Sequence, residues 1–353
     1  MSKILMKGNE AFGEAAVLAG CKYFFGYPIT PQSELPHYMA KRLPEVGGVF
    51  LQAESEIAAI NMVYGAAGAG ARVMTSSSGP GISLKMEGVS YLAGAELPAV
   101  LVNVVRGGPG LGNIAPAQSD YFQATKGGGH GDYRLIVLAP SSVQEIVDLT
   151  AKAFDLADQY MNPVMLLADG ILGQMMEPVE LKDIKPNIPA KPWAVNGMKG
   201  RAYRNLIVSV HIVAEDNEKF NLTLQAKYDK IFQNEVLYEN YKMDDAEFVM
   251  VAYGSSARLA KGAVDKAREK GLKVGLIRPI TLWPFPSERL AEAATTAKAF
   301  LTVEMSLGQM VEDVRLAVNG VKPVYLYTRT GGMVPVVKDI VVELEKIVQG
   351  GGK

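Results

Sequence analysis

GYPITPQSE, residues 26–34, follows the apolar run Tyr23–Phe25 and precedes a helical pattern that begins near Ser33. Pro28 and Pro31 stiffen this turn, because each fixes its own φ and biases the residue before it toward extended geometry. The hydroxyl of Thr30 is then expected beside a helix N-terminus, where free N–H groups favour an anion such as a small carboxylate. The alternative is an ordinary proline-braced turn with Ser33 as helix cap.

Apolar strands alternate with amphipathic helices on both sides of this turn, as far as about residue 170. The predicted strands are 23–25, 72–75, 99–105, 135–138 and 164–168; the predicted helices are 33–42, 56–69, 82–93 and one from Ser142, which has capping-box spacing to Glu145. Strands regularly separated by helices indicate a parallel sheet with helices on both faces.

The pattern breaks between residues 174 and 245, where prolines at 178, 186, 189 and 192 predict an extended connector. Phe220, Leu224, Tyr228 and Ile231 recur at helical spacing, which predicts a charged amphipathic helix, either at a domain or subunit boundary or simply on the surface. Alternation then resumes, with strands expected at 248–253, 274–278, 300–304 and 324–327 and helices after residues 254, 287, 306 and 335.

We therefore expect an α/β fold of two parallel-sheet domains, 1–173 and 246–353, joined by the connector 174–245. Hydrophobic residues form 48% of the 353-residue chain and charged residues 21%, enough apolar material for two buried cores. The formal net charge is −1 and no basic block occurs, so nucleic acid is not an expected partner. No apolar run approaches the roughly 18 residues of a membrane span.

The single cysteine, Cys21, excludes a disulfide within the chain and a cysteine-based zinc or iron–sulfur site built from this chain alone. Leu18-Ala19-Gly20-Cys21 mimics a lipoprotein cleavage box, but Glu10 and Glu14 interrupt the segment where an apolar core is required. A cytoplasmic protein is the expectation.

Several familiar catalytic signatures are missing from the sequence. There is neither a G-x-x-x-x-G-K-[ST] phosphate loop nor a G-x-S-x-G nucleophile elbow, and His37, His130 and His211 are too scattered to suggest a metal triad. Gly110, Gly112 and Ala115 match G-x-G-x-x-A, but far from a first βα turn, so we interpret this stretch as a substrate-covering loop instead of a dinucleotide site.

Glu56 opens an otherwise apolar helix of small residues, Ile57 to Gly70. A carboxylate at a helix start is often only a complement to the helix dipole. Here the alanine- and glycine-rich face predicts close packing, which would desolvate the acid and favour its protonated form. Such a carboxyl suits thiamine diphosphate, because it can hydrogen-bond the aminopyrimidine ring and promote formation of the reactive ylid.

Long motifs across the chain resemble the α-type subunit of 2-oxoacid:ferredoxin oxidoreductases. These are GYPITPQSE, the helix of Glu56, TSSSGPGISLKMEG from Thr75, VVRGGPG from Val104, RPITLWPFP from Arg278, VEMSLGQMVEDVRLAVNG from Val303 and TRTGGMVP from Thr328. Within this family the chain is most similar to the branched-chain (3-methyl-2-oxobutanoate) enzymes, which share a long charged connector; the 2-oxoglutarate enzymes are the alternative.

The resemblance implies a fold and a set of site residues. The first domain would be of the pyrimidine-binding type for thiamine diphosphate, and the second would be similar to the C-terminal domain of transketolase, with a structural role. Glu56 would activate the cofactor, with Glu54 as the second choice. Thr30 and Arg106 would bind the substrate carboxylate. The cofactor-binding residues would be Glu56, Tyr27, Pro28, Ile29, Ser78 and Gly79; Asp120 would organise the edge of the site or cap a helix.

The implied reaction is oxidative decarboxylation of a 2-oxoacid, with coenzyme A as co-substrate and ferredoxin as electron acceptor. One cysteine cannot ligate a cluster, and no acidic motif for magnesium diphosphate is evident, so the resemblance implies Mg²⁺ and [4Fe-4S] clusters on partner subunits. The implied partners are a β-type subunit that shares the thiamine diphosphate, a γ-type subunit and a δ-type ferredoxin-like subunit. Two other functions stay open: a non-oxidative thiamine diphosphate enzyme and a non-catalytic scaffold subunit.

Overall fold

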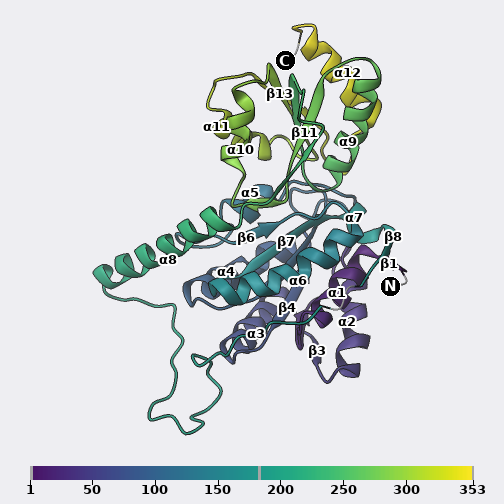
Figure 1. Ribbon diagram of the computed structural model, residues 1–353. Coiled ribbons are helices and arrows are strands. Elements are labelled where there is room, and N and C mark those ends of the chain that lie inside the picture. The colour runs from purple at the N-terminus through teal and green to yellow at the C-terminus, as the bar shows by residue number, and fades with distance from the viewer. Residues whose placement is uncertain (1–2, 182–183, 352–353) are drawn as a thin grey trace.

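The computed structural model describes residues 3–181 and 184–351, which form two α/β domains stacked end to end (Figure 1). The first domain contains a seven-stranded sheet in the order β12-β6-β7-β5-β4-β2-β3. Its strands are β2 (Tyr23–Gly26), β3 (Val49–Gln52), β4 (Val73–Ser77), β5 (Val100–Val105), β6 (Ile136–Leu138), β7 (Val164–Asp169) and β12 (Thr281–Trp283). All neighbours are parallel except β12, which is antiparallel to β6.

Helices cover both faces of this sheet, as the alternating sequence pattern predicts. They are α1 (Gly8–Leu18), α2 (Glu34–Glu45), α3 (Glu56–Gly68), α4 (Pro80–Gly94), α5 (Tyr121–Thr125), α6 (Val143–Tyr160) and α7 (Gly170–Gln174). Apolar side chains of α1, α2 and α6 form one core with the strands, and those of α3 and α4 form another on the opposite face. Both faces of the central strands are therefore buried, which is why β5, β6 and β7 are mostly apolar.

The second domain is a smaller five-stranded sheet in the order β14-β13-β10-β11-β9. Its strands are β9 (Tyr238–Tyr241), β10 (Phe248–Val251), β11 (Val274–Pro279), β13 (Ala299–Glu304) and β14 (Val324–Thr328), and its helices are α9 (Gly254–Glu269), α10 (Ser287–Ala294), α11 (Met310–Val318) and α12 (Val337–Val348). Only β9 is antiparallel to its neighbour in this sheet. The predicted α/β fold of two parallel-sheet domains is confirmed, with one antiparallel edge strand added to each sheet.

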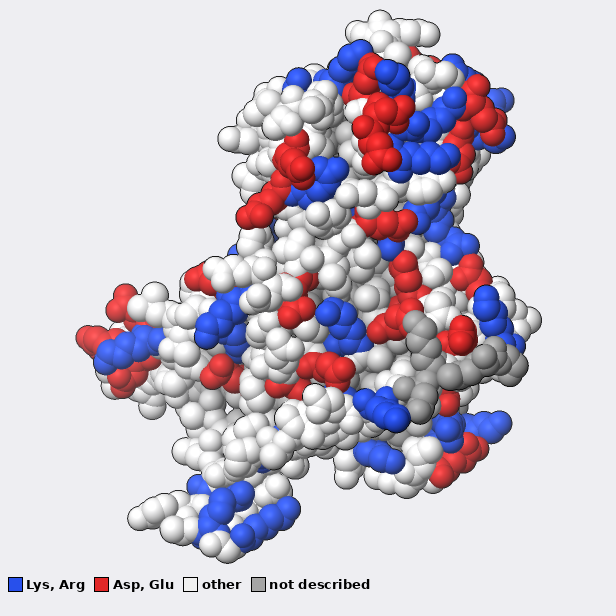
Figure 2. Space-filling view, in the orientation of Figure 1, with Lys and Arg blue, Asp and Glu red and all other residues white. Residues whose placement is uncertain are grey.

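Charged side chains of both signs are interspersed on the visible face of the second domain (Figure 2). Ion pairs between exposed side chains of this domain include Lys270–Glu345 and Lys298–Glu247. This mixture is consistent with the near-zero net charge of the sequence.

The connector contains more regular structure than its prolines indicate. β8 (Met176–Val179) pairs antiparallel with β1 (Ile4–Lys7), and α8 (Ala214–Asn234) projects to the side of the molecule after a long loop (Figure 1). The predicted amphipathic helix is confirmed: Leu224, Tyr228 and Ile231 are buried against the core of the first domain. The apolar side of this helix therefore packs on the first domain, and whether its other side meets a partner subunit stays a prediction.

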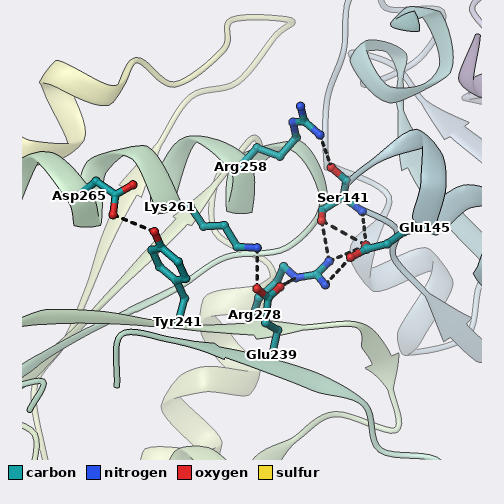
Figure 3. Close-up of polar contacts among 8 residues, drawn as sticks. All are labelled: Ser141, Glu145, Glu239, Tyr241, Arg258, Lys261, Asp265 and Arg278. Atoms are coloured by element: carbon teal, nitrogen blue, oxygen red, sulfur yellow. Dashed lines mark hydrogen bonds and ion pairs between the residues drawn. The ribbon is translucent and has the colours of Figure 1, made fainter. Parts of the chain in front are cut away.

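A buried arginine links the two domains (Figure 3). Arg278, at the end of β11, donates to both carboxylate oxygens of Glu145 on α6 at 2.8 Å and to Glu239 of β9 at 2.8 Å. Burial raises the pKa of Glu145, but Arg278 and Ser141 outweigh it and hold that pKa below its usual value. The predicted capping box is therefore only half formed: Ser142 accepts from the N–H of Glu145, while the Glu145 carboxylate bonds Ser141 and Arg278.

Replacing Arg278 with methionine is expected to lower the free energy of unfolding by about 3 kcal/mol, because Glu145 and Glu239 would lose their shared cation. Denaturant unfolding at pH 7 measures this. The loss should shrink as the pH falls through the depressed pKa of Glu145, since protonated Glu145 no longer needs the cation. Lys261→Met is the matched control, because Lys261 pairs with the same Glu239 but is 32% exposed, and it should cost less than about 1 kcal/mol. Equal losses in both variants would refute the interdomain role of Arg278.

Candidate active site

The predicted site residues lie on loops at one edge of the first sheet. β2, β3, β4 and β5 are parallel neighbours, so the loops that leave their carboxyl ends meet there. The chain order reverses between β2, which leads outward to β3, and β4, which leads the other way to β5. Ligands of open α/β sheets bind in the crevice at such a switch point.

The loop after β2 is held from several sides. The carbonyl oxygen of Pro31 accepts from Asn9 at 2.8 Å and from Gln174 at 2.9 Å, and that of Thr30 accepts from Arg106 at 3.0 Å. Gln32 accepts a hydrogen bond from Ser76 and donates to the carbonyl of Tyr27. The Thr30 residue itself is exposed.

Ser33 occupies the N-cap position of α2, but its side chain makes no capping hydrogen bond. The alternative interpretation of this turn, in which the Ser33 side chain caps the helix, is therefore wrong, because that capping hydrogen bond is not formed. Gln32 and Arg106, not a cap, fix the loop that carries Tyr27, Pro28, Ile29 and Thr30.

The position of Glu56 separates it from Glu54. Glu56 is only 6% exposed at the first turn of α3, whereas Glu54 is exposed. Ser55 caps this helix by accepting from the N–H of Ala58 at 3.1 Å. Among the residues that the structure describes, none donates a hydrogen bond to the Glu56 carboxyl, which leaves its oxygens available to a ligand.

Gly81 allows the loop after β4 to pack directly on Glu56. A Cβ at this position would lie 2.2 Å from Ser77 Oγ and 2.5 Å from Glu56 Oε1, distances that no side chain can adopt. The first turn of α4 therefore closes onto the carboxyl because this residue is glycine.

Several buried polar atoms at this edge have no hydrogen-bond partner among the described residues, including Ser77 Oγ, Ser78 Oγ and Arg106 Nε. Buried polar groups in folded proteins are nearly always paired, so a cluster of unpaired ones indicates the place of a bound molecule. Gly79 contributes to the same cradle, because a Cβ there would lie 3.0 Å from Arg106 Nε. These groups and the free carboxyl of Glu56 fit a polar cofactor in this crevice.

Arg106 follows β5 and is 7% exposed. Its terminal nitrogens donate to the carbonyls of Thr30 and Leu111, each at 3.0 Å, so it joins the turn after β2 to the glycine loop. Asn103 donates to Asp120 at 2.9 Å, and Asp120 makes no helix-capping bond. Burial raises the pKa of Asp120, while Asn103 and the charge of Arg106 oppose that rise.

A cavity of about 510 Å³ lies against Arg106 and Asp120. Gly79, Arg106 and Asp120 are the predicted residues that line it. The other predicted site residues do not line this cavity: Tyr27, Pro28, Ile29, Thr30, Glu56 and Ser78. Gly107, Gly108, Pro109 and Gly110 of the glycine loop form one wall. The full lining is Gly79, Pro80, Ser83, Arg106, Gly107, Gly108, Pro109, Gly110, Ser119, Asp120, Gln123, Leu307, Gln309 and Thr330.

The second domain supplies part of this lining, which the sequence did not reveal. Gln309 accepts from the N–H of Phe122 at 2.8 Å and donates to the carbonyl of Ser119 at 2.7 Å, and Asn113 donates to Gly331 at 2.9 Å. The sequence feature that could have indicated this contribution is that SLGQM and TRTGG directly follow predicted strands, where site loops of parallel sheets lie. The second domain therefore shapes the cavity, with Leu307, Gln309 and Thr330 among its lining residues.

Metal and cysteine chemistry have little support within residues 3–181 and 184–351. No group of three or more His, Cys, Asp or Glu side chains there could hold a metal ion. Cys21 is buried, and burial raises the pKa of its thiol to about 12. In the same part of the chain, no helix has the length and apolar character needed to cross a membrane.

Residues 14–234 match the family "Pyruvate flavodoxin/ferredoxin oxidoreductase, thiamine diP-bdg", and residues 246–340 match "Pyruvate:ferredoxin oxidoreductase core domain II". The chain is a 2-oxoacid:ferredoxin oxidoreductase subunit. The resemblance inferred from the sequence motifs is thereby confirmed. The first match covers every loop of the crevice described above, and the second covers the loops that complete the cavity.

Relatives of this oxidoreductase subunit match most or all of its length. It is 56% identical over 353 residues to ketoisovalerate oxidoreductase subunit VorB of Methanothermobacter thermautotrophicus, covering 100% of this chain and 99% of the relative. It is 42% identical over 322 residues to 2-oxoglutarate synthase subunit KorA of Archaeoglobus fulgidus, covering 89% and 91%.

Two solved structures are similar to the oxidoreductase subunit. One is 2-oxoglutarate:ferredoxin oxidoreductase from Magnetococcus marinus with 2-oxoglutarate, coenzyme A and succinyl-CoA bound (TM-score 0.90, 30% identity, 99% of this chain and 66% of that chain). The other, a split-gene transketolase described as an inactive β4 tetramer, shares the fold with a TM-score of 0.61 at 14% identity, covering 98% of each chain.

Proposed function

We propose that this chain is the subunit that activates thiamine diphosphate and binds the substrate in a ferredoxin oxidoreductase acting on 3-methyl-2-oxobutanoate. The products would be the acyl-CoA, CO₂ and reduced ferredoxin, with coenzyme A as co-substrate. The observation that carries this proposal is the 56% identity over the whole chain to a ketoisovalerate oxidoreductase subunit, against 42% to a 2-oxoglutarate synthase subunit.

Glu56 has the environment that the proposed proton transfer needs. Its carboxyl is buried, close to Ser77, and free of hydrogen bonds from the described residues, so it can bond a ring nitrogen of the cofactor and exchange a proton with it. When bound, thiamine diphosphate would supply the carbon nucleophile and stabilise the carbanion left by loss of CO₂. Tyr27, Pro28, Ile29, Ser78 and Gly79 would form the cradle for it.

Arg106 and Thr30 are proposed to bind the carboxylate of the 2-oxoacid. Arg106 lines the cavity, and its Nε has no partner among the described residues. An anionic substrate would pair with this fork, and the Thr30 hydroxyl would add a second donor. The bonds to the carbonyls of Thr30 and Leu111 fix the guanidinium in place before the substrate arrives.

The lining of the cavity favours an apolar substrate tail. Arg106 is the one cationic residue among its lining residues, and Asp120 adds a carboxyl. A second carboxylate, as in 2-oxoglutarate, would have no further cation of this chain to pair with there and would face Asp120. The 2-oxoglutarate enzyme remains the alternative, because a partner subunit can supply further pocket walls.

The complete enzyme would require partner subunits. We propose that a β-type subunit holds Mg²⁺ and the diphosphate end of the cofactor, and that [4Fe-4S] clusters lie on β- and δ-type subunits, with a γ-type subunit completing the complex. Exposed apolar side chains on α3 and α4, namely Ile57 (47%), Leu84 (47%) and Tyr91 (42%), support a subunit contact beside the crevice. The cytoplasmic location remains a prediction from the sequence.

The test is 2-oxoacid-dependent dye reduction by the anaerobically purified native complex, supplied with thiamine diphosphate and coenzyme A. 3-Methyl-2-oxobutanoate, 2-oxoglutarate and pyruvate are compared side by side. The fastest reduction is expected with the branched acid. Reduction led by 2-oxoglutarate would overturn the substrate but keep the mechanism, and no reduction by an iron- and thiamine-containing complex would favour the non-oxidative or scaffold functions.

A further inference from the structure

The connector contains a strand-like segment, NLIVSVHIV (residues 205–213), in the long loop that leads to α8 at the outer edge of the molecule (Figure 1). Every second residue of this segment contacts the rest of the chain. Ile207 packs on the apolar core that α3 and α4 cover, and Ser209 lies against the C-terminal end of α4. His211 stacks on Phe220 of α8, with the ring centroids 4.6 Å apart. This period of two is that of an extended strand.

The residues between these contacts form a continuous exposed apolar row. The exposed fractions are 80% for Leu206, 44% for Val208, 66% for Val210 and 94% for Ile212. Single exposed apolar residues are normal on a protein surface, but a continuous row indicates a contact surface. The segment also contains no charged residue, proline or glycine, although natural proteins use charges and proline to protect exposed strand edges from pairing.

The backbone of the 205–213 segment is available for pairing. No hydrogen bond joins the N–H and C=O groups of residues 206–212 to any other residue that the structure describes. The start of the segment is fixed, because the Asn205 side chain donates to the carbonyls of Pro192 and Ala194. An extended segment that is held in place and has unpaired backbone groups is a template for another strand.

The charges on either side of the segment select a second copy of this chain as that partner. Residues 184–204, which precede it, contain lysine and arginine but no carboxylate, and the last two of these cations are Arg201 and Arg204. The first turn of α8, which follows it, contains Glu215 and Asp216. Two copies that pair antiparallel bring the arginines of each copy beside the carboxylates of the other. A parallel pair would place like charges together, which is unfavourable.

We propose that the 205–213 segments of two copies of this chain pair as antiparallel strands across a twofold axis at Ser209. In this register Leu206 of one copy lies opposite Ile212 of the other. Val208 lies opposite Val210 in the same way, so that each exposed apolar side chain gains an apolar neighbour. A twofold contact of this kind needs only one surface, because the same residues serve both copies. The inference does not depend on the proposed function.

The test is the oligomeric state of the purified full chain, measured by sedimentation velocity over a concentration series. The wild-type chain is expected to form a dimer in a concentration-dependent manner. Val210→Lys should weaken this dimer on the order of tenfold, because the twofold axis places two lysines in the strand pair, each opposite Val208 of the other copy. Val321→Lys is the matched control, since Val321 is 63% exposed in a loop of the second domain, and it should dimerise like the wild type.

Hydrogen exchange and cross-linking test whether the 205–213 segment itself forms the contact. The amides of residues 206–212 should exchange more slowly as the dimer forms, because strand pairing gives them hydrogen-bond partners. Ser209→Cys should be joined to a second copy by a short bis-maleimide, since position 209 lies at the twofold axis. The wild-type chain should not be cross-linked, because its single cysteine, Cys21, is buried.

Charge reversal tests the antiparallel direction. Arg204→Glu should weaken the dimer, and the double variant R204E/E215R should recover part of the loss, because the opposite charges are then exchanged between the copies. A double variant no better than R204E would overturn the antiparallel arrangement.

Three other results would overturn the inference: a wild-type chain that is monomeric at every concentration, equal dimerisation of V210K and V321K, or no cross-linking of S209C. If residues 206–212 are protected from exchange only in the native complex, and the chain alone is monomeric, the partner of the segment is a different subunit.

Discussion

Replacing Glu56 with glutamine should lower kcat of the assembled complex on the order of 10³-fold, because general acid–base groups contribute about 10² to 10⁴ and an amide cannot exchange the required proton. The change keeps the shape of a residue that is only 6% exposed, so the fold and the packing against Ser77 should be retained. Steady-state dye reduction with saturating thiamine diphosphate measures the effect.

Glu54→Gln is the matched control for this experiment. Glu54 lies two residues earlier and is exposed, so its replacement should change kcat less than about twofold if only the buried carboxyl acts. Equal activity in E56Q and in the wild type would mean that this subunit is a scaffold. A collapse in E54Q with normal E56Q would transfer the role to Glu54.

Replacing Arg106 with leucine is expected to reduce kcat/KM for the 2-oxoacid on the order of 10²-fold, equivalent to roughly 3 kcal/mol for losing a charged, buried hydrogen-bonding partner. Most of the loss should appear in KM, because the carboxylate is bound before and during the reaction. The kcat/KM of Arg106→Lys should lie between those of the wild type and R106L. An ammonium keeps the positive charge but cannot reproduce the two guanidinium hydrogen bonds to the Thr30 and Leu111 carbonyls.

The control for Arg106 is Arg134→Leu, which removes one positive charge from an exposed residue that does not line this cavity. R134L should retain normal KM for the substrate. An R106L complex with unchanged KM would show that Arg106 only fixes the loops, and the substrate carboxylate would then have to be bound by Thr30 or by a partner subunit.

The sequence was sufficient to predict which loops meet at the carboxyl ends of the parallel strands. Regular alternation predicts such a sheet, and parallel strands necessarily bring GYPITPQSE, the start of the Glu56 helix, TSSSGPG and VVRGG to one edge. The burial of Glu56 was also predictable, since the helix it opens is rich in alanine and glycine. The roles of Glu56, Thr30 and Arg106 remain proposals.

What sequence reasoning missed depends on contacts between distant segments. Short edge strands such as β3 and β12 carry only four and three residues and no clear period. In the sequence Gln309 is one polar residue of a loop, and its contact with Ser119 exists only because the second domain packs on the first. Glu145 likewise pairs with Arg278 only because the two domains are in contact. Lys85 lies in a quoted motif, but its burial against Thr75 depends on how α4 packs on β4.

The placement of β12 in the first sheet affects how the protein can be made and divided. This strand comes from residues 281–283, after β9, β10 and β11 of the second sheet, yet it pairs with β6. During synthesis, where domains generally fold from the N-terminus onward, the first sheet cannot be completed until most of the chain has left the ribosome. A gene cut at residue 245 would also leave β6 as an open edge, with unpaired backbone groups prone to aggregation. Two domains that are separate as folds are therefore one unit of biosynthesis.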